Sequence, residues 1–280
     1  MQPRCEVLVS LDLDGTAVRY DPRLEMDPAL VEYLIMMRQQ GVAWVMNSDR
    51  YTDTMIDIAC LLEPENRPAA LLSCQRFIHF LDGRDMYLPF NQWNRQRIML
   101  HKRLWGKIAP FFDEWQRSID SEFTVIERVI NDLVFAYMVP ADQTPALRVR
   151  MRELVRPWPE AQLSGNHDWT FVLHAAFSKG SVLLRCAEKL GIERHNIIAV
   201  GDGLNDISML DGSITPMVGC PANASSEVLD AVRKAGGIVA EKEAASGTLD
   251  VLRHYLGHAP NDFRNRAVHM GRHDVFSGPL

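Results

Sequence analysis

The sequence predicts an α/β fold in which a parallel sheet is the middle of three layers, with an α+β domain inserted into it. Short apolar runs alternate along the chain with stretches of helical periodicity, a pattern typical of parallel strands joined by helices. The alternation stops near residue 85 and resumes near residue 173, which indicates the insertion. A chain of 280 residues has room for one large domain or two modest ones.

The first segment is predicted to contribute three strands and two helices. The strands are continuous apolar runs, as expected of strands buried on both faces: residues 7–11, 42–46 and 69–72. The first helix begins at Asp27 and Pro28, a capping residue followed by proline at the first helical position, and ends before Gly41. The second helix covers residues 51–62 and stops before Pro64.

Residues 85–172 are predicted to form the inserted domain. Aromatic and arginine side chains recur with helical spacing over residues 88–120. Two strands, a helix and two more strands then follow: residues 123–129, 133–139, 145–155, 161–164 and 170–174. The tryptophans of this segment fit either the packing of a small domain or contact with sugar rings. His167 and His174 are its candidate substrate contacts.

The alternation resumes with a helix that Ser178 caps and that ends at Gly191. The remaining predicted strands and helices are residues 197–200, 215–218, 224–235, 238–240 and 247–256. Residues 1–84 and 173–258 are therefore predicted to form the core domain. Residues 259–280 lack periodicity, and we expect a loosely ordered tail.

Composition limits the partners and the compartment. The chain has 30 Lys and Arg against 36 Asp and Glu, a net charge of −6, and no basic tract, so we expect neither nucleic acid nor an anionic membrane as a partner. No apolar run approaches the ~18 residues of a membrane helix, and the run before Asp12 is too short for a signal peptide. The five cysteines are scattered, which predicts no disulfide framework. We expect a soluble cytoplasmic protein that is a monomer or a small homo-oligomer.

Two acidic motifs follow apolar strands. Residues 12–16 (DLDGT) end the first strand, where ligands bind in open parallel sheets. Residues 201–206 (GDGLND) come after the predicted strand 197–200. The second motif lacks the third glycine of a dinucleotide-binding loop, and neither motif fits an EF-hand calcium loop. Four carboxylates at two strand ends favour a hard cation bound through oxygen, and Mg²⁺ fits best.

Two further motifs supply groups that could bind phosphate. Residues 47–50 (NSDR) place a serine hydroxyl at the end of a strand, where it is either a phosphate ligand or a simple helix cap. Lys179 lies in the first turn of its helix, where a cation opposes the helix dipole. Helix stability therefore does not explain this lysine, and the alternative is a solvated surface residue.

The order of these four motifs resembles that of the haloacid-dehalogenase-like (HAD) phosphatase superfamily. The resemblance covers residues 5–83 and 172–257 and implies a Rossmann-like core. Residues 85–171 are similar to the large α/β cap domain of the Cof-type and sucrose-phosphatase-like branches. Residues 219–224 (GCPANA) look like the loop that follows the fourth motif in this family.

The resemblance implies a role for each motif residue. Asp12 is the implied nucleophile, and Asp14 is the general acid and then the general base. Ser48 and Lys179 hold phosphoryl oxygens. The implied Mg²⁺ ligands are the Asp12 side chain, the Asp14 backbone carbonyl and the Asp202 side chain, with Asp206 supporting either the metal site or the lysine. The implied substrate contacts are Gly15, Thr16, Asn47, Arg50 and Asn205.

The implied activity is Mg²⁺-dependent hydrolysis of a small phosphorylated metabolite, such as a sugar phosphate, through an aspartyl phosphate. Two alternatives share the same residues: a phosphosugar mutase and a non-catalytic protein that binds a phosphorylated ligand. The sequence departs from the family pattern at two places. Asp49 stands where related chains have glycine, and residues 73–75 (SCQ) replace the usual Asn-Gly turn before the cap domain.

Overall fold

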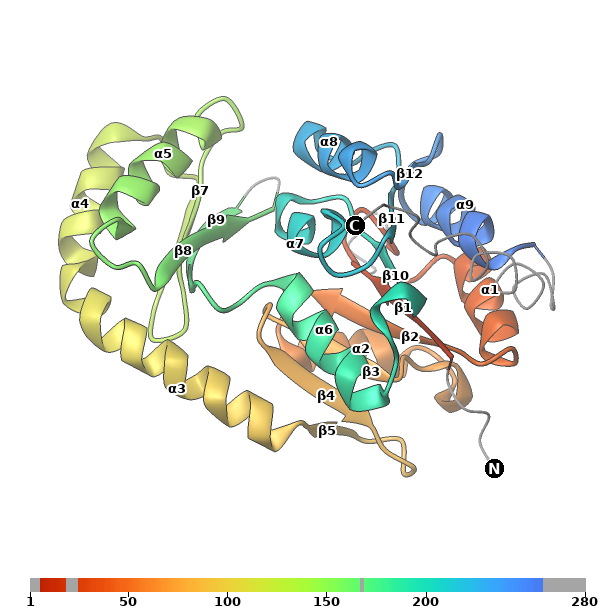
Figure 1. The fold of residues 1–280 in the computed structure, drawn as a ribbon. Coiled ribbons are helices and arrows are strands. Elements are labelled where there is room, and N and C mark those ends of the chain that lie inside the picture. The colour runs from red at the N-terminus through yellow and green to blue at the C-terminus, as the bar shows by residue number, and fades with distance from the viewer. Residues whose placement is uncertain (1–5, 19–24, 167–168, 259–280) are drawn as a thin grey trace, which may run out of the picture.

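The computed structural model describes residues 6–18, 25–166 and 169–258 (Figure 1). Its larger sheet has eight strands in the order β12-β11-β10-β1-β2-β3-β4-β5. The strands, in that order, are Ile238–Val239, Met217–Cys220, Ile197–Val200, Val7–Leu11, Val42–Ser48, Ala70–Ser73, Phe77–Leu81 and Tyr87–Pro89. Neighbours from β12 to β3 are parallel, whereas β4 and β5 run antiparallel at one edge. The predicted α/β fold is confirmed.

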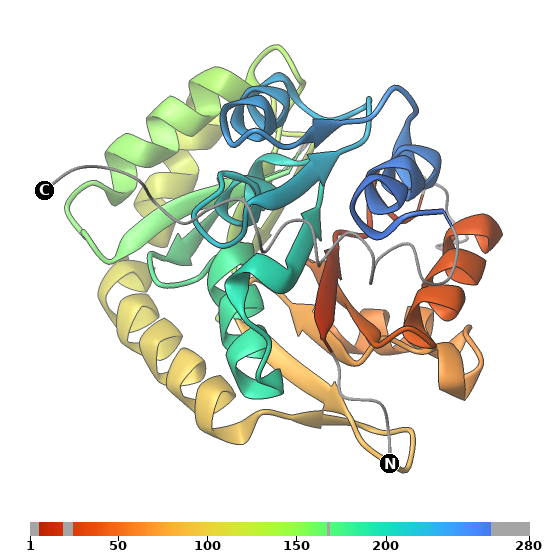
Figure 2. The same cartoon turned by 45° about the vertical axis from the view of Figure 1, so that its right-hand side comes forward.

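Helices cover both faces of this sheet and make three layers (Figure 2). One face carries α1, α2 and α9, which are Pro28–Arg38, Thr52–Cys60 and Ala244–Leu256. The other carries α6, α7 and α8, which are Lys179–Leu190, Ile207–Leu210 and Ser226–Lys234. Val9 packs in the first layer and Leu8 in the second, so β1 is apolar on both sides. This is why its sequence reads as a continuous apolar run.

Local signals in the sequence explain where several helices begin and end. The Asp27 side chain accepts N–H bonds from Ala29 and Leu30 at the start of α1. Ser178 caps α6 in a capping box, and Gly191 ends this helix in the left-handed region at φ 71°. Short 3₁₀ turns occupy Pro64–Asn66, Ala109–Phe111, Arg194–Asn196 and Leu204–Asp206.

The edge strands β4 and β5 were not anticipated from the sequence. β4 is only partly buried, so its residues do not form the continuous apolar run that marks a parallel strand. The turn from β3 to β4 passes through Cys74 at φ 53° and Gln75 at φ 57°. Two successive positive φ angles define the tight hairpin that Asn-Gly usually makes, so this chain builds the same turn from residues that are less suited to it.

The smaller sheet is antiparallel, in the order β6-β7-β9-β8. Its strands are Glu127–Ile130, Phe135–Met138, Trp169–His174 and Ala161–Gly165, and its helices α3, α4 and α5 are Asn91–Ile108, Phe112–Glu122 and Thr144–Val155. We call the segment from α3 to β9 the inserted domain. It has its own apolar core, which includes Trp105 and Trp115 and has Trp158 packed against it. Most of the predicted elements of this segment are therefore present, with ends that differ by a few residues.

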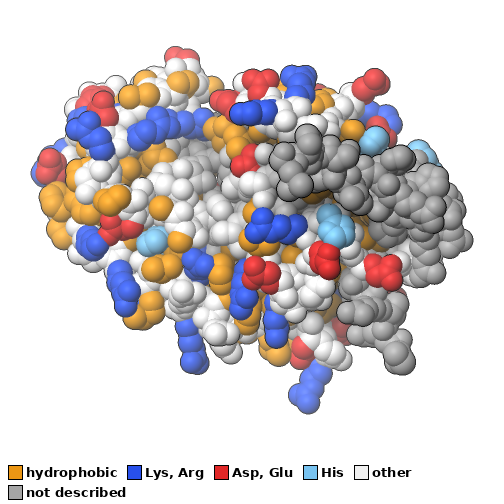
Figure 3. All heavy atoms as spheres, viewed as in Figure 1, with side chains coloured by type: hydrophobic (Ala, Val, Ile, Leu, Met, Phe, Trp, Pro, Cys, Tyr) orange, Lys and Arg blue, Asp and Glu red, His pale blue; other side chains and the backbone are white. Residues whose placement is uncertain are grey.

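Other features bear on the sequence predictions. The tail 259–280 and His167 lie outside the described residues. None of the helices in the described part of the chain combines the length and apolar character that a membrane crossing requires. Acidic and basic side chains are interspersed on the face shown in Figure 3, which agrees with the absence of a basic tract from the sequence.

Candidate active site

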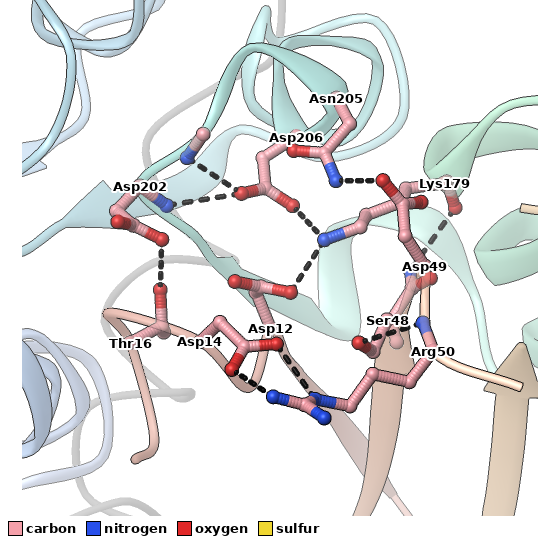
Figure 4. A network of polar contacts seen from close by, with 12 residues as sticks. Asp12, Asp14, Thr16, Ser48, Asp49, Arg50, Lys179, Asp202, Asn205 and Asp206 are labelled. Atoms are coloured by element: carbon pink, nitrogen blue, oxygen red, sulfur yellow. Dashed lines mark hydrogen bonds and ion pairs between the residues drawn. The ribbon is translucent and has the colours of Figure 1, made fainter. Parts of the chain in front are cut away.

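The four motifs meet at the carboxyl edge of the larger sheet (Figure 4). β1 lies between β10 and β2, so the residues that follow these three strands are neighbours. The backbone N–H of Asp12 donates to the carbonyl of Val200 at 3.0 Å, which extends the β1–β10 pairing into the first motif. Asp12 is 5% exposed and turns toward the fourth motif. The sheet topology thus brings together residues nearly two hundred positions apart.

Lys179 is the cationic centre of the site. Its side chain is fully buried, and its ammonium group donates to Asp12 Oδ1 at 2.5 Å and to Asp206 Oδ1 at 2.6 Å. Burial alone would lower the pKa of Lys179, but the charges of Asp12 and Asp206 outweigh burial and raise that pKa. The lysine is therefore charged at neutral pH, and the alternative of a solvated surface residue is excluded.

Burial disfavours the ionised form of the acidic side chains in the site. Burial, and after it the charge of Asp206, raises the pKa of Asp12 well above its ordinary value, while Lys179 opposes this shift. Burial also raises the pKa of Asp206 to about 6, against the opposing effect of Lys179. Ionised carboxylates at this density call for further positive charge beyond a single lysine.

Asp206 is fixed by the loop that carries it. Its Oδ2 accepts the backbone N–H groups of Asp202 at 3.0 Å and Gly203 at 2.9 Å, while Oδ1 accepts from Lys179. A Cβ at Gly201 would lie 2.4 Å from Cγ of Asp206, so the loop needs glycine there. Because both oxygens are engaged, this geometry favours Asp206 as a support for the lysine and the loop over a role as a direct metal ligand.

Asp202 is oriented by two side-chain donors. Thr16 donates its hydroxyl to Asp202 Oδ1 at 2.9 Å, and Asn223 donates to Oδ2 at 3.2 Å. Asn223 also donates to the carbonyl of Gly15 at 2.9 Å, so one amide ties the first motif to the fourth. Asn223 lies in the loop 219–224 but is not among the residues predicted for the site. The feature of the sequence that could have identified it is the asparagine in the Pro-Ala-Asn-Ala part of that loop.

Asp14 and Arg50 form a two-point ion pair. The guanidinium donates from Nε to Asp14 Oδ2 at 2.8 Å and from Nη2 to Oδ1 at 2.6 Å. Each side chain is about one quarter exposed, and both line the same cavity. Arg50, predicted as a substrate contact, is thus directed in this structure at the predicted general acid and base.

The second motif contacts the fourth through Asp49. Its Oδ2 accepts the side-chain amide of Asn205 at 2.5 Å, whereas its Oδ1 is buried without a hydrogen-bond partner. The aspartate that departs from the family pattern is therefore held by Asn205 and not by Arg50. Ser48 accepts the backbone N–H of Arg50 at 3.2 Å and lines the small cavity beside Asp12.

Three of the predicted substrate contacts have polar groups engaged within the protein. Asn47 is fully buried and donates to the carbonyl of Lys179 at 3.1 Å. Thr16 is fully buried and donates its hydroxyl to Asp202. The N–H of Gly15 donates to the carbonyl of Val18 at 2.9 Å. The geometry of Asn47 and Thr16 fits positioning of the catalytic groups, and their contact with substrate stays a prediction.

The residues around Asp12 suit a small divalent cation. Ligand oxygens of Asp12, Asp202 and Asp206 all lie within 4.8 Å of one another. A cavity of about 20 Å³ adjoins Asp12 and Asp202; its lining residues are Asp12, Asp14, Ser48, Asp49, Asn166, Asp202, Gly203 and Asn205. That volume holds about one water-sized particle, and carboxylate oxygens are the ligands that Mg²⁺ prefers.

A larger cavity of about 430 Å³ opens beside the catalytic carboxylates. Its polar wall comes from the core: Asp14, Asp49, Arg50, Tyr51, Cys74 and Arg76. Its opposite wall belongs to the smaller sheet and is mainly apolar: Val129, Leu133, Val134, Ala136, Asn166, Trp169, Phe171 and Leu173. Along β9, Phe171 faces the cavity while Val172 packs in the core of the inserted domain, as the two-residue period of a strand requires.

Comparisons with known proteins identify the family. A model of the haloacid dehalogenase-like hydrolases matches residues 78–251, which is more than half of the chain. The chain belongs to this family. The predicted membership and the hydrolase class are therefore confirmed, whereas the role of the inserted domain as a cap stays a prediction.

Similar proteins include a curated relative and several solved structures. The Bacillus subtilis protein named "Putative phosphatase YxeH" is 26% identical over 161 residues, which are 55% of this chain and 52% of the relative. The chain thus aligns with about half the length of this curated relative. The sucrose-phosphatase of Synechocystis, solved with sucrose and phosphate, has a TM-score of 0.66 at 18% identity, with 90% of this chain and 98% of that one covered. A HAD subclass IIB sugar phosphatase has a TM-score of 0.60 at 15% identity, with 89% and 98% covered. At these identities the two structures show the shared fold.

Proposed function

We propose that this HAD hydrolase is a Mg²⁺-dependent phosphomonoesterase that releases phosphate from a small phosphorylated metabolite of sugar-phosphate size. The observation that carries the proposal is the buried Asp12 carboxylate bonded to Lys179 at 2.5 Å, with Asp14 two residues further on at the edge of the substrate cavity. This arrangement provides a nucleophile, a phosphate-binding cation and a proton donor within one short loop and its neighbours.

The charge balance of the site supports a divalent cation. Asp12, Asp202 and Asp206 contribute −3 and Lys179 contributes +1, so the buried set has a formal charge of −2. Asp12 and Asp202 are the side chains we assign to hold Mg²⁺, because both line the small cavity and Asp206 does not. When bound, the ion would neutralise phosphoryl charge and keep Asp12 ionised.

The residues of the chain then account for the chemistry. An Asp12 oxygen forms a bond to phosphorus as the bond from phosphorus to the ester oxygen breaks, and Asp14 gives its proton to the leaving alcohol. A water molecule next attacks phosphorus, loses a proton to Asp14 and releases phosphate together with the Asp12 carboxylate. We assign Lys179 and Ser48 to hold phosphoryl oxygens during both steps. For proton transfer, an Asp14 oxygen has to leave the guanidinium of Arg50.

The lining of the cavity on the side of the inserted domain indicates a small, partly apolar substrate. The cavity of about 430 Å³ has the size of a small-molecule site. Trp169 and Phe171 line its cap side, and aromatic faces suit the ring of a sugar. Two of the similar structures are a sucrose-phosphatase and a sugar phosphatase, which point to the same class of substrate.

Phosphate release from p-nitrophenyl phosphate and a panel of sugar phosphates tests the proposal. The assay is run with Mg²⁺, with EDTA, and with the Asp12→Asn variant. We expect turnover that needs Mg²⁺ and that falls by at least a thousandfold in the variant. A folded, Mg²⁺-loaded protein that releases phosphate from no substrate would refute the phosphatase. Turnover that appears only as isomerisation after a sugar bisphosphate is added would identify the mutase instead.

A further inference from the structure

The substrate cavity contains a second arginine, and this one is buried. Arg76 follows the turn between β3 and β4, is 7% exposed and lines the cavity of about 430 Å³. Its Nη1 donates to His101 Nδ1 at 3.0 Å, and its Nη2 donates to the carbonyl of Leu133 at 3.4 Å. Its Nε is buried without a hydrogen-bond partner. A guanidinium has five N–H donors, and several of them are here unused or weakly used.

No carboxylate pairs with Arg76 among the residues that the structure describes. The groups with the strongest electrostatic effect on it are the Cys74 thiol, the Tyr51 phenol and the Asp49 carboxylate. Burial raises the pKa of Cys74 to about 11, so its thiol is neutral at pH 7. Asp49 already accepts from Asn205 through Oδ2. Burying an unpaired guanidinium is costly, and proteins seldom do so without a partner.

Two other arginines show what is unusual about Arg76. Arg50 uses its Nε and Nη2 edge to hold the carboxylate of Asp14 at two points. The same edge of Arg76 is little used, because its Nε has no partner and its Nη2 reaches only the carbonyl of Leu133 at 3.4 Å. Arg97 is also buried and also has an unpartnered Nε, and both guanidinium groups lie near aromatic rings: Arg97 over Trp93 at 3.5 Å, and Arg76 over Phe77 at 5.3 Å and Phe177 at 5.7 Å. Arg97, however, does not line the cavity. Of these three arginines, only Arg76 both lacks a carboxylate partner and lines the cavity.

We infer that Arg76 binds a second anionic group of the substrate, so that the alcohol released by the hydrolase carries a carboxylate or a further phosphate. The inference rests on the proposed function, because the phosphoryl group is taken to lie beside Asp12. The apolar cap wall then contacts the carbon skeleton between the two anions. Asp49 lines the same cavity, and its buried Oδ1 has no hydrogen-bond partner among the described residues, so it suits a hydroxyl donor on that skeleton. The substrate class is a hydroxylated phosphomonoester with a second anion.

Matched pairs of phosphate esters test this inference. Glucose 6-phosphate and 6-phosphogluconate differ by a carboxylate, and fructose 6-phosphate and fructose 1,6-bisphosphate differ by a phosphate. We expect wild-type kcat/KM to be at least tenfold higher for the anionic member of one pair, as a charge-assisted hydrogen bond requires. The pair that shows the preference distinguishes carboxylate from phosphate.

Two variants attribute the preference to its source. Arg76→Gln should reduce the ratio of kcat/KM within the preferred pair to about one, and Arg97→Gln, the buried control outside the cavity, should leave that ratio unchanged. A wild-type enzyme with no preference for either anionic ester would overturn the inference. An Arg76→Gln variant in which kcat/KM falls equally for both members of a pair would also overturn the inference.

A binding measurement separates this inference from the proposed function. Calorimetric titration of the Asp12→Asn protein with the same four esters measures their affinities without hydrolysis. Tighter binding of the anionic ester that is lost in Asp12→Asn/Arg76→Gln would support Arg76 even if the wild type hydrolysed nothing. Equal affinities within both pairs would refute the role of Arg76 while leaving the phosphatase standing.

Discussion

Glycine at position 201 is predicted to be essential to the catalytic geometry, because its missing side chain is the space that Asp206 occupies. In Gly201→Ala, the new Cβ would lie 2.4 Å from Cγ, 2.6 Å from Oδ2 and 2.7 Å from Cβ of Asp206. Asp206 cannot easily retreat, since it accepts from Lys179 at 2.6 Å and from two backbone N–H groups at 3.0 and 2.9 Å. The variant must therefore either distort the loop or break these bonds.

The magnitude follows from those contacts. Overpacking a rigid interior costs about 1–3 kcal/mol of stability, which corresponds to a fall in Tm of roughly 2–12 °C for a chain of this size. Loss of one hydrogen bond to a charged group, worth about 1.5–3 kcal/mol, would also displace Lys179 from Asp12. If that energy is lost in the transition state, kcat/KM on p-nitrophenyl phosphate falls roughly 10- to 150-fold.

Thermal unfolding and steady-state kinetics measure both effects. Gly106→Ala is the matched control: Gly106 is a helical glycine in α3, and an added Cβ there meets nothing within 4 Å. We expect this control to keep wild-type activity and to gain up to about 1 kcal/mol of stability. Asp206→Ala should remove the contacts with Cγ and Oδ2 and leave the one with Cβ, so Gly201→Ala should cost less in that background than in the wild type. Wild-type Tm and kcat/KM in Gly201→Ala would refute the steric argument.

The remaining predictions concern the metal, the pH dependence and the acid–base pair. Asn223→Ala should raise the Mg²⁺ concentration needed for half-maximal activity about 10- to 100-fold, because Asp202 loses a donor that orients it; an unchanged Mg²⁺ titration would contradict this. The pKa of Asp206 is raised from 3.8 to about 6, so ionising it disfavours the folded state. In EDTA, the free energy of unfolding should therefore fall, on the order of 1–3 kcal/mol, as the pH rises from about 4 to 6. Asp206→Asn should make this slope shallower in urea melts, and the part that stays belongs to Asp12, whose pKa is raised as well. Arg50→Gln should lower kcat about 10- to 100-fold, because the Asp14 carboxyl loses the contact that positions it through one oxygen while the other transfers the proton. Equal kcat values would make Arg50 dispensable.

Much of the core could be predicted because burial leaves a direct mark on composition. β1, β2 and β10 are buried on both faces, so their residues read as continuous apolar runs. Motifs that directly follow such strands must lie at the carboxyl edge of the sheet, and this placed Asp12, Ser48 and Asp202 near one another. The half-exposed edge strands β4 and β5 leave no comparable mark, and they were missed.

The contacts within the site were less predictable because they join residues that are distant in sequence. Asp49 and Asn205 are 156 positions apart, and their hydrogen bond depends on how β2 and β10 flank β1. The pairing of Arg50 with Asp14 depends in the same way on the side-chain directions at two strand ends. The sequence showed that position 49 is unusual, but only the packed structure shows which partner its carboxylate takes.

The distribution of charge across the site gives each anion of the proposed substrate its own partner. Lys179 is shared by Asp12 and Asp206, and Arg50 is held at two points by Asp14. A phosphoryl group entering beside Asp12 therefore adds negative charge to a set that is already negative, which is why a divalent cation is expected there. A second anion beside the phosphoryl group would lie against the same acidic residues, with Asp14 next to them. Arg76 brings a cation without a carboxylate partner to the cavity wall, so a substrate with two anions would place the second one against it.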